Sequence, residues 1–270
     1  MAETTATHED EYDDDLLAML VLVWGEGFLS PGGPGAVRSI VGAHDLRGQR
    51  VLDIGCGLGG IDVLLARDHG AEVVGVDVEA ELVRRAGERV EREGLASQVE
   101  IRAVQPGPLP FPDASFDVVF SKDSWIHVED KRTLFADVFR LLQPGGRLLA
   151  GDWMRGPEPF SEHMLRFFEL EGLTYHMATL DDAGRLLAEA GFEGIELEDL
   201  TDEYRRQAHR EYEQMRGPWN GRMSRLLGED KAAHFVENWR VLTVVLDRGE
   251  LRPGRLRAYK PAGAPGGSDG

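Results

Sequence analysis

The segment that most restricts the fold of this chain is R-V-L-D-I-G-C-G-L-G-G, residues 50–60. Its first half is a short apolar run that is typical of a buried strand. Glycines crowd the six positions that follow, and they let the backbone turn sharply and approach a ligand because no Cβ stands in the way. The apolar periodicity of residues 61–67 then predicts a helix. Strand, glycine loop and helix together predict a nucleotide-type binding turn at the end of a parallel sheet.

The rest of the chain continues this alternation. Strands are predicted at 51–54, 72–76, 99–104, 116–120 and 147–150, with helices at 61–68, 79–93 and 131–142. We therefore expect an α/β fold, a doubly wound, mostly parallel seven-stranded sheet with a helical cap insertion. Helices are also expected at 16–24, 36–43, within 156–177 and at 180–190, followed by a sixth strand at 194–200, two or three helices in 201–246 and a hairpin-like pair of strands in 251–259.

The composition limits the kinds of partner that the protein can bind. The 270 residues include 48 acidic and 30 basic side chains, which gives a formal net charge of -18. An acidic surface repels phosphate backbones, so we expect no nucleic-acid partner, and a small substrate fits better, a cationic one included. The single cysteine, Cys56, excludes an internal disulfide and a cysteine-based zinc cluster, and we interpret it as a small residue that fits the glycine loop.

The start of the chain lacks the features of a secretory signal. Residues 1–10 are polar and acidic, without the basic and apolar regions that a signal peptide carries. The longest apolar run, residues 16–24, has nine residues and is too short to span a bilayer. We therefore expect a cytoplasmic protein without a membrane partner.

A glycine-rich turn alone does not select a ligand, but its surroundings do. Asp53 lies on the strand before the glycines, and Asp77 ends the second strand, where a carboxylate can accept hydrogen bonds from both ribose hydroxyls. Together with D-V-V-F at 117–120 and L-L-Q-P-G-G-R-L-L at 141–149, the pattern resembles the class I S-adenosylmethionine-dependent methyltransferases. The resemblance covers roughly residues 50–152.

That resemblance implies a cofactor, S-adenosylmethionine, with S-adenosylhomocysteine as its product and no metal. It places Gly55, Gly57 and Gly59 under the methionine part, Asp53 near the amino group, Asp77 at the ribose and Val78 against the adenine. Gln105 stands where such enzymes often carry an acid, and its amide oxygen can still accept from the adenine amino group. The remaining residues that we expect around the cofactor are Leu29, Ser30, Val104, Ser121 and Lys122.

Two further segments carry a narrower resemblance, to the phosphoethanolamine N-methyltransferases. They are Y-D-D-D-L-L-A-M-L-V-L-V-W-G-E-G-F-L-S-P-G-G, which begins at Tyr12, and S-K-D-S-W-I-H-V at 121–128. This resemblance implies that Tyr12 and His127 form a closing pair over the active site, and we expect Asp123 to act with them. Asp123 and His127 are four positions apart, so they share one face if a helical turn forms.

The expected reaction explains these residue types. Transfer from a sulfonium depends mostly on alignment of the nucleophile with the methyl group. An amine with a pKa of about 10 must also lose its proton, which a carboxylate or an imidazole at Asp123 or His127 would assist. We expect Asp123, Trp125, Trp153 and Tyr175 to contact the substrate, because aromatic faces attract methylated ammonium groups.

The match to the narrower family breaks where its members bind phosphate. Segment 171–177, E-G-L-T-Y-H-M, keeps Tyr175 but has Leu173 where the family has an arginine, and Trp153 replaces a tyrosine. A leucine cannot bind an oxyanion. The candidates to replace that arginine are Arg166, Arg222 and Arg240.

Three hypotheses about function follow. The first is N-methylation of a small polar amine, either phosphoethanolamine-like or a free amine or amino acid such as glycine, sarcosine or dimethylglycine. The second is O- or C-methylation of a secondary metabolite, and the third is a catalytically silent cofactor-binding protein. On this interpretation residues 1–45 form a helical lid, 46–155 the cofactor-binding core, 156–260 the rest of the sheet with a helical substrate cap, and 261–270 a disordered tail. The oligomeric state and the number of methyl groups transferred stay open.

Overall fold

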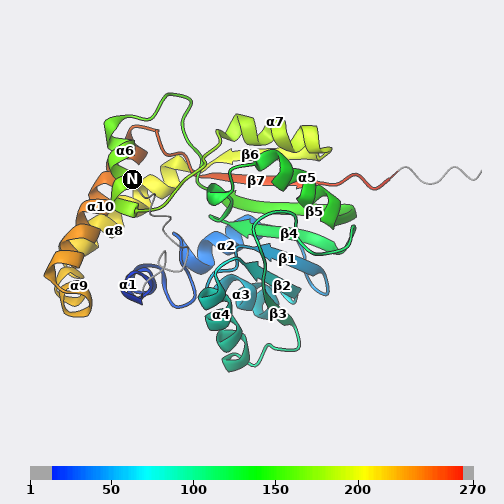
Figure 1. The fold of residues 1–270 in the computed structure, drawn as a ribbon, viewed down its shortest axis with the longest axis horizontal. Coiled ribbons are helices and arrows are strands. Elements are labelled where there is room, and N and C mark those ends of the chain that lie inside the picture. Colours follow the sequence, from blue (N-terminus) through cyan, green and yellow to red (C-terminus); the bar gives the residue numbers. More distant parts are fainter. Residues whose placement is uncertain (1–13, 264–270) are drawn as a thin grey trace, which may run out of the picture.

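A computed structural model describes residues 14–263 and places a seven-stranded sheet at their centre (Figure 1). The strand order is β3-β2-β1-β4-β5-β7-β6, and β7 runs antiparallel to both of its neighbours while β1 to β5 are parallel. The predicted doubly wound, mostly parallel sheet is therefore confirmed. The strands are β1 Arg50–Ile54, β2 Glu72–Asp77, β3 Val99–Ala103, β4 Phe116–Lys122, β5 Leu142–Asp152, β6 Glu193–Asp199 and β7 Gly254–Tyr259.

Helices cover both faces of the sheet, and this explains why the central strands are apolar at successive positions. Val51 and Val73 pack into the core under α2, α3 and α4. Their neighbours Leu52 and Val74 point to the opposite face, into the core under α5 and α7. The helices of the first face are α2 Gly33–Val41, α3 Gly60–His69 and α4 Ala80–Arg92, and those of the second are α5 Lys131–Leu141 and α7 Leu180–Ala190.

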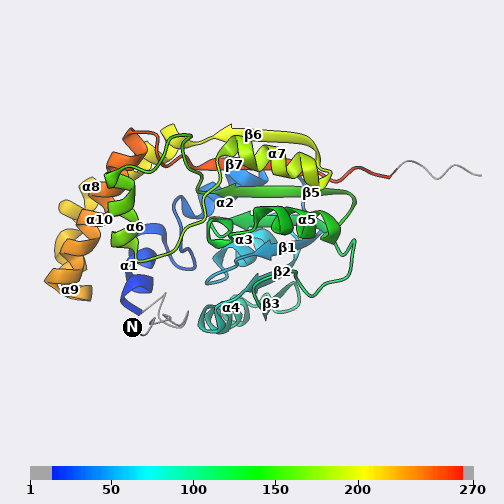
Figure 2. The same cartoon turned by 45° about the horizontal axis from the view of Figure 1, so that its top comes forward.

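The remaining α-helices gather at one end of the sheet (Figures 1 and 2). They enclose a core of their own, which includes Met19, Met164, Met215, Trp239 and Leu246. We call this group the helical layer, and it consists of α1 Asp14–Trp24, α6 Glu162–Glu171, α8 Thr201–Arg216, α9 Asn220–Leu227 and α10 Glu229–Asp247. The N-terminal helix α1, α6 after β5 and α8 to α10 after β6 thus form one packed unit.

The expectation of a hairpin-like pair at 251–259 is wrong. Leu251 makes only an isolated antiparallel bridge with Arg155, and a single strand, β7, begins at Gly254. Pro253 explains the break, because proline has no N–H to donate to a ladder. Instead the Pro253 carbonyl accepts from Leu200 N at 2.8 Å, which fixes the end of β6 beside the start of β7.

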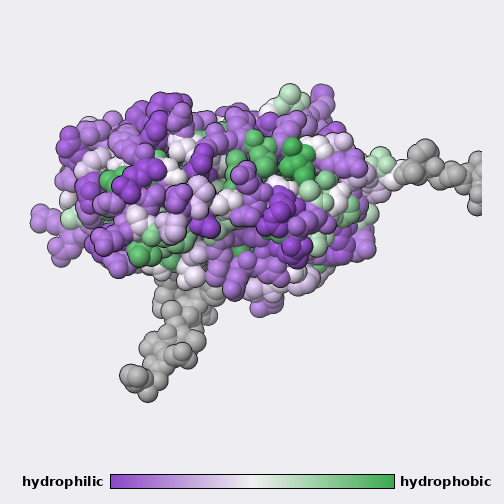
Figure 3. Space-filling model, turned by 90° about the horizontal axis from the view of Figure 1, so that it is seen from above, coloured by the Kyte–Doolittle hydropathy of each residue, from purple (hydrophilic) through white to green (hydrophobic). Residues whose placement is uncertain are grey.

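Hydrophilic side chains dominate the face shown in Figure 3, and apolar side chains form small groups among them. None of the helices in residues 14–263 combines the length and the apolar composition needed to cross a bilayer. The end of the predicted tail, residues 264–270, lies outside the described part of the chain.

Candidate active site

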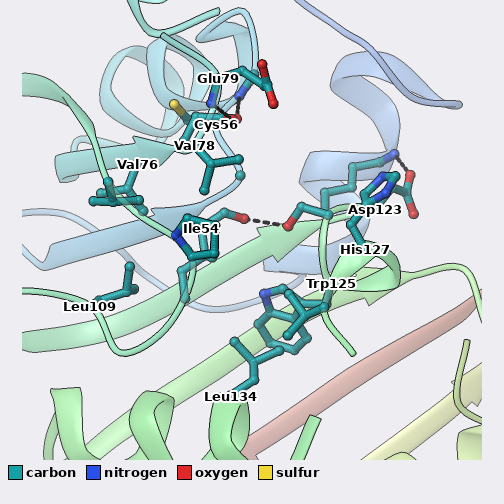
Figure 4. Close-up of a pocket in the computed structure, with 18 of the residues that line it drawn as sticks. Ile54, Cys56, Val76, Val78, Glu79, Leu109, Asp123, Trp125, His127 and Leu134 are labelled. Atoms are coloured by element: carbon teal, nitrogen blue, oxygen red, sulfur yellow. Dashed lines mark hydrogen bonds and ion pairs between the residues drawn. The ribbon is translucent and has the colours of Figure 1, made fainter. Parts of the chain in front are cut away.

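A cavity of about 600 Å³ lies at the carboxyl ends of β1, β2 and β4 (Figure 4). The strand order reverses between β1 and β4, and open α/β sheets bind ligands at such a switch point. The volume falls within the range of small-molecule sites. Its walls come from the loop between α1 and α2, the glycine loop, the end of β2, the loop after β3, the segment after β4 and the start of α5.

The glycine loop closes one end of the cavity with its backbone. Gly55 N and Cys56 N donate to Val76 O at 2.8 and 3.0 Å, which fastens the loop to β2. Gly55 has φ +82°, and a Cβ there would lie 2.2 Å from the Cβ of Ser124. Only glycine therefore fits at this position.

The predicted glycines do not all reach the cavity. Gly55 and Gly57 line it, whereas Gly59 does not. Gly59 instead precedes α3, and a Cβ there would lie 3.0 Å from the Cβ of Ala86 in α4. Its role in the structure is the close approach of two helices.

Asp77 joins the glycine loop to the end of β2. Its carboxylate accepts from Gly57 N at 2.9 Å and from Glu79 N at 3.1 Å. Burial raises the pKa of Asp77, and the backbone hydrogen bonds oppose that rise. A carboxylate has about four lone-pair sites, so Asp77, which lines the cavity beside Val78, can still accept from a hydroxyl group there.

Asp53 lies behind the glycine loop and not in the cavity wall. It is fully buried next to Asp62, and among the described residues none of the four carboxylate oxygens of this pair has a hydrogen-bond partner. Burial, followed by the charges of Asp62 and Asp77, raises the pKa of Asp53 well above its usual range. Burial raises the pKa of Asp62 to about 7. The sequence interpretation missed Asp62, although a carboxylate among the apolar residues of 61–66 is a visible signal.

The opposite wall is mostly apolar. Ile54, Val76, Leu109 and Leu134 form a slot that can hold a flat ring, and Figure 4 shows their side chains around the cavity. Val104 and Gln105 lie at its edge, where Val104 is buried and Gln105 is exposed. Val78 and Gln105, the two residues expected at the adenine, therefore both line the cavity.

The segment after β4 supplies the charged end of the cavity. Lys122 and Asp123 form an ion pair whose side chains are only 1% and 3% exposed. Lys122 Nζ also donates to Ser30 Oγ at 2.6 Å, and Leu29 lies beside Ser30 in the wall. The Oδ1 atom of Asp123 is buried without a hydrogen-bond partner among the described residues. Ser121 does not line the cavity, because its hydroxyl is bonded to Ile54 O at 2.8 Å.

The helical turn expected between Asp123 and His127 is not α-helical. Asp123 has φ +55°, and the chain then forms a short 3-10 helix, η2 Trp125–His127. Both Asp123 and His127 still line the cavity. His127 Nδ1 lies 3.3 Å from Thr174 O, and its ring centroid is 5.5 Å from that of Tyr175.

The four residues expected to contact the substrate separate into two pairs. Asp123 and Trp125 line the cavity, and the buried Nε1 of Trp125 has no partner among the described residues. Trp153 and Tyr175 do not line it. Trp153 packs edge-on against Tyr204, with ring centroids 5.1 Å apart, and the Tyr175 hydroxyl bonds Glu171 Oε2 at 3.1 Å.

Tyr12, the proposed partner of His127, lies outside the described residues.

Asp152 is a second residue that the sequence interpretation missed. It ends β5 beside Asp123, whose N–H donates to Gly151 O at 2.8 Å. Burial, helped by the charge of Asp123, raises the pKa of Asp152 to about 8, while Lys131 acts in the opposite direction. The signal was present, because neighbouring parallel strands end at the same edge of a sheet.

Comparisons with known proteins agree with this geometry. The family profile described as "Methyltransferase domain" matches residues 52–150. Phosphoethanolamine N-methyltransferase 3 of Arabidopsis thaliana is 33% identical over 235 residues, covering 79% of this chain and 47% of the relative. An O-methyltransferase of Aspergillus nomiae is 36% identical over 158 residues, covering 58% of this chain and 70% of the relative.

Among solved structures, phosphoethanolamine N-methyltransferase 2 of Haemonchus contortus superimposes with a TM-score of 0.86 and 26% identity. The match covers 93% of this chain and 59% of the nematode chain, which was solved with phosphomonomethylethanolamine and S-adenosylhomocysteine. The chain therefore belongs to the class I S-adenosylmethionine-dependent methyltransferases. Within that class it is similar to the phosphoethanolamine N-methyltransferases, although it spans about half the length of the plant relative.

Proposed function

We propose that this chain transfers a methyl group from S-adenosylmethionine to the nitrogen of a small polar amine. The observation that carries the proposal is one continuous cavity, with the glycine loop and Asp77 at one end and Asp123 and His127 at the other. The similarity to enzymes named phosphoethanolamine N-methyltransferases supports nitrogen as the acceptor atom.

The residues present fit the cofactor. Asp77 can still accept from a hydroxyl group, the slot beside Val78 is apolar, and the backbone at Gly55 and Gly57 leaves room where a side chain would intrude. When bound, S-adenosylmethionine supplies an electrophilic methyl group on a sulfonium. The residues that we propose to hold it directly or from behind the wall are Leu29, Ser30, Asp53, Gly55, Gly57, Gly59, Asp77, Val78, Val104, Gln105, Ser121 and Lys122.

His127 is proposed to take the proton that the amine must lose. If Nδ1 donates to Thr174 O, 3.3 Å away, the lone pair of the neutral ring lies on Nε2, which can accept a proton. Asp123 is proposed to attract the ammonium form and to hold Lys122 in place. Tyr12 is proposed to close over the acceptor with His127, as the family resemblance implies.

The helical layer is proposed to act as the cap that excludes water, and α1 as part of a lid. Leu17 of α1 packs against Leu58 of the glycine loop and Leu82 of α4, so this helix is fixed to the cofactor end of the cavity. Exclusion of water strengthens the electrostatic interactions inside a site.

A second candidate function is supported by the similarity to an O-methyltransferase. Both candidates use the same cofactor site and differ in the acceptor atom. The third hypothesis, a silent cofactor-binding protein, does not explain why Asp123 and His127 both line the cavity.

A methyl-transfer assay with labelled donor tests the proposal. The acceptors are phosphoethanolamine, ethanolamine, glycine, sarcosine, dimethylglycine and a set of phenols, and mass spectrometry locates the new methyl group. We expect N-methylated product from at least one amine and none from the phenols. Methylation of phenolic oxygen alone would refute the proposal in favour of the second candidate.

A further inference from the structure

We propose that the acceptor is an unphosphorylated ammonium compound, and that a phosphate group on the acceptor weakens its binding. This inference rests on the proposed function and narrows the class of amine that the same cavity takes. It follows from the distribution of charge in and around the cavity.

The cavity wall is strongly acidic. Among the described residues that line it, only Lys122 carries a permanent positive charge, and only His127 can acquire one. Six carboxylates line the same cavity, namely Asp77, Glu79, Asp123, Glu129, Asp130 and Asp137. Fields of one sign inside a cleft attract the opposite charge and repel the same charge.

Lys122 is already engaged by other groups. Its ammonium pairs with Asp123 and donates to Ser30 Oγ at 2.6 Å, and both charged side chains are nearly fully buried. A phosphate monoester carries a charge of about -1.5 to -2 at neutral pH and is normally bound by several Arg or Lys donors. One ammonium that is already neutralised does not meet that requirement.

The arginines that could replace the family's phosphate ligand are elsewhere. Arg166, Arg222 and Arg240 are exposed on the helical layer, and none of them lines the cavity. Arg166 pairs with Glu169 at 3.0 Å, and Arg240 pairs with Glu237 at 2.7 Å.

A second concavity of about 500 Å³ does contain guanidinium groups, but Glu129 is the only described residue that lines both concavities. Two of its arginines are paired, Arg132 with Glu189 and Arg185 with Asp182 and Glu189. The third, Arg155, lies over the ring of Phe160. A hydrogen bond of 2.7 Å from His176 N to Ile126 O fastens the segment between the two concavities.

The groups behind the charged end favour a cation. Asp123 leaves one buried carboxylate oxygen without a partner among the described residues. Its charge helps burial to raise the pKa of the neighbouring Asp152 carboxyl, although Lys131 opposes that rise. Trp125 adds an aromatic wall, to which an ammonium group is attracted. An ammonium placed there offsets negative charge, whereas a phosphate adds to it.

The test measures binding to the full chain saturated with S-adenosylhomocysteine, by calorimetry. The probes are choline, phosphocholine and 3,3-dimethylbutan-1-ol, which is the neutral isostere of choline. We expect choline to bind about tenfold more tightly than each of the other two. Equal or tighter binding of phosphocholine overturns the inference, and so does equal binding of the neutral alcohol or no binding of any probe.

Two variants test whether Asp123 is responsible for the preference for choline. Asp123→Asn should weaken choline about tenfold and leave the neutral alcohol within about twofold, while S-adenosylhomocysteine affinity shows that the variant is folded. The matched control is Glu162→Gln, because Glu162 is exposed on α6 and does not line the cavity, and choline affinity should stay within about twofold.

A third variant, Arg155→Ala, examines the second concavity. We expect no change in phosphocholine affinity, and a loss would show that a phosphate reaches Arg155 and would overturn the inference. The methyl-transfer assay separates the two proposals. Preferential methylation of phosphorylated amines would refute this inference and leave the proposed function standing. Selective ammonium binding without methylation of any amine would refute the proposed function alone.

Discussion

The two ends of the cavity are built in different ways. At the cofactor end, backbone groups determine the shape: the glycine loop is bonded to Val76 O, and Asp77 is held by the amides of Gly57 and Glu79. At the acceptor end, side chains from distant segments meet, as when the rings of His127 and Tyr175 lie 5.5 Å apart. A site made from backbone groups depends little on side-chain identity, whereas one made from side chains can change its specificity by substitution.

The largest expected effect comes from a substitution at the acceptor end, which should lower turnover and leave cofactor affinity nearly unchanged. His127→Ala should lower kcat by about 100-fold or more, the range of general acid–base catalysis, and change S-adenosylhomocysteine affinity less than about threefold. Kinetics and calorimetry measure the two quantities, and Tyr12→Phe should follow the same pattern. The control is His163→Ala, since His163 is exposed on α6 and does not line the cavity. Equal losses of turnover and affinity would refute the proposed closing pair.

The sequence predicted the cofactor end of the cavity better than the acceptor end. Apolar periodicity was sufficient for the parallel strands β1 to β5 but not for the last strand, and the position of Asp77 at the end of β2 brought it to the cavity. The loop itself was less specific, because Gly55, Gly57 and Gly60 also satisfy the dinucleotide pattern G-x-G-x-x-G. Only its combination with the later segments favoured a methyltransferase.

The acceptor end was harder to predict, because side-chain direction there depends on packing between separate helices. Trp153 was expected to face the substrate but packs against Tyr204 of α8, and Tyr175 bonds Glu171 instead. Asp152 was missed because only the pairing of β4 with β5 brings it beside Asp123, which follows β4. The apolar pattern of a single segment does not predict such contacts between separate segments.

The second prediction concerns a substitution at the cofactor end, which should weaken cofactor binding. Asp77→Ala should weaken S-adenosylhomocysteine binding by about 100-fold, because it removes the proposed ribose contact and leaves two amides without an acceptor. Calorimetry measures the affinity. Glu72→Ala is the matched control, since Glu72 is exposed at the start of the same strand. An unchanged affinity for Asp77→Ala would remove Asp77 from the cofactor site.

The third prediction tests the fit of the glycine loop against the segment after β4. Gly55→Ala should destabilise the fold by about 2 kcal/mol or more, because the new Cβ would overlap Ser124 and the positive φ is strained. Gly87→Ala, at a helical position of α4 with no atom within 4 Å of the new Cβ, should stabilise by about 1 kcal/mol. Urea unfolding measures both, and a neutral Gly55→Ala would show that the two ends are not in contact.

The smallest expected effect concerns the pH dependence of the free energy of unfolding. It distinguishes the buried carboxyl group of Asp62 from that of Asp152. Folding raises the pKa of Asp62 from 3.8 to about 7, so across this range the folded protein holds a proton that the unfolded chain has released. The stabilising contribution of this proton is complete at low pH and is lost as the pH rises towards 7. Asp62→Asn should flatten that decline by about 1 kcal/mol or more between pH 5 and pH 7, measured by urea unfolding.

Asp152→Asn should also flatten the decline of the free energy of unfolding with pH. Its effect should extend to a higher pH, because the pKa of Asp152 is raised to about 8. Of the two variants, only Asp152→Asn should also shift the pH profile of kcat, since Asp152 lies beside Asp123 whereas Asp62 lies behind the glycine loop. A shift in the kcat profile of Asp62→Asn would show that proton binding at the cofactor end is coupled to the chemistry at the acceptor end. The division between a backbone-built end and a side-chain-built end would then hold for shape but not for electrostatics.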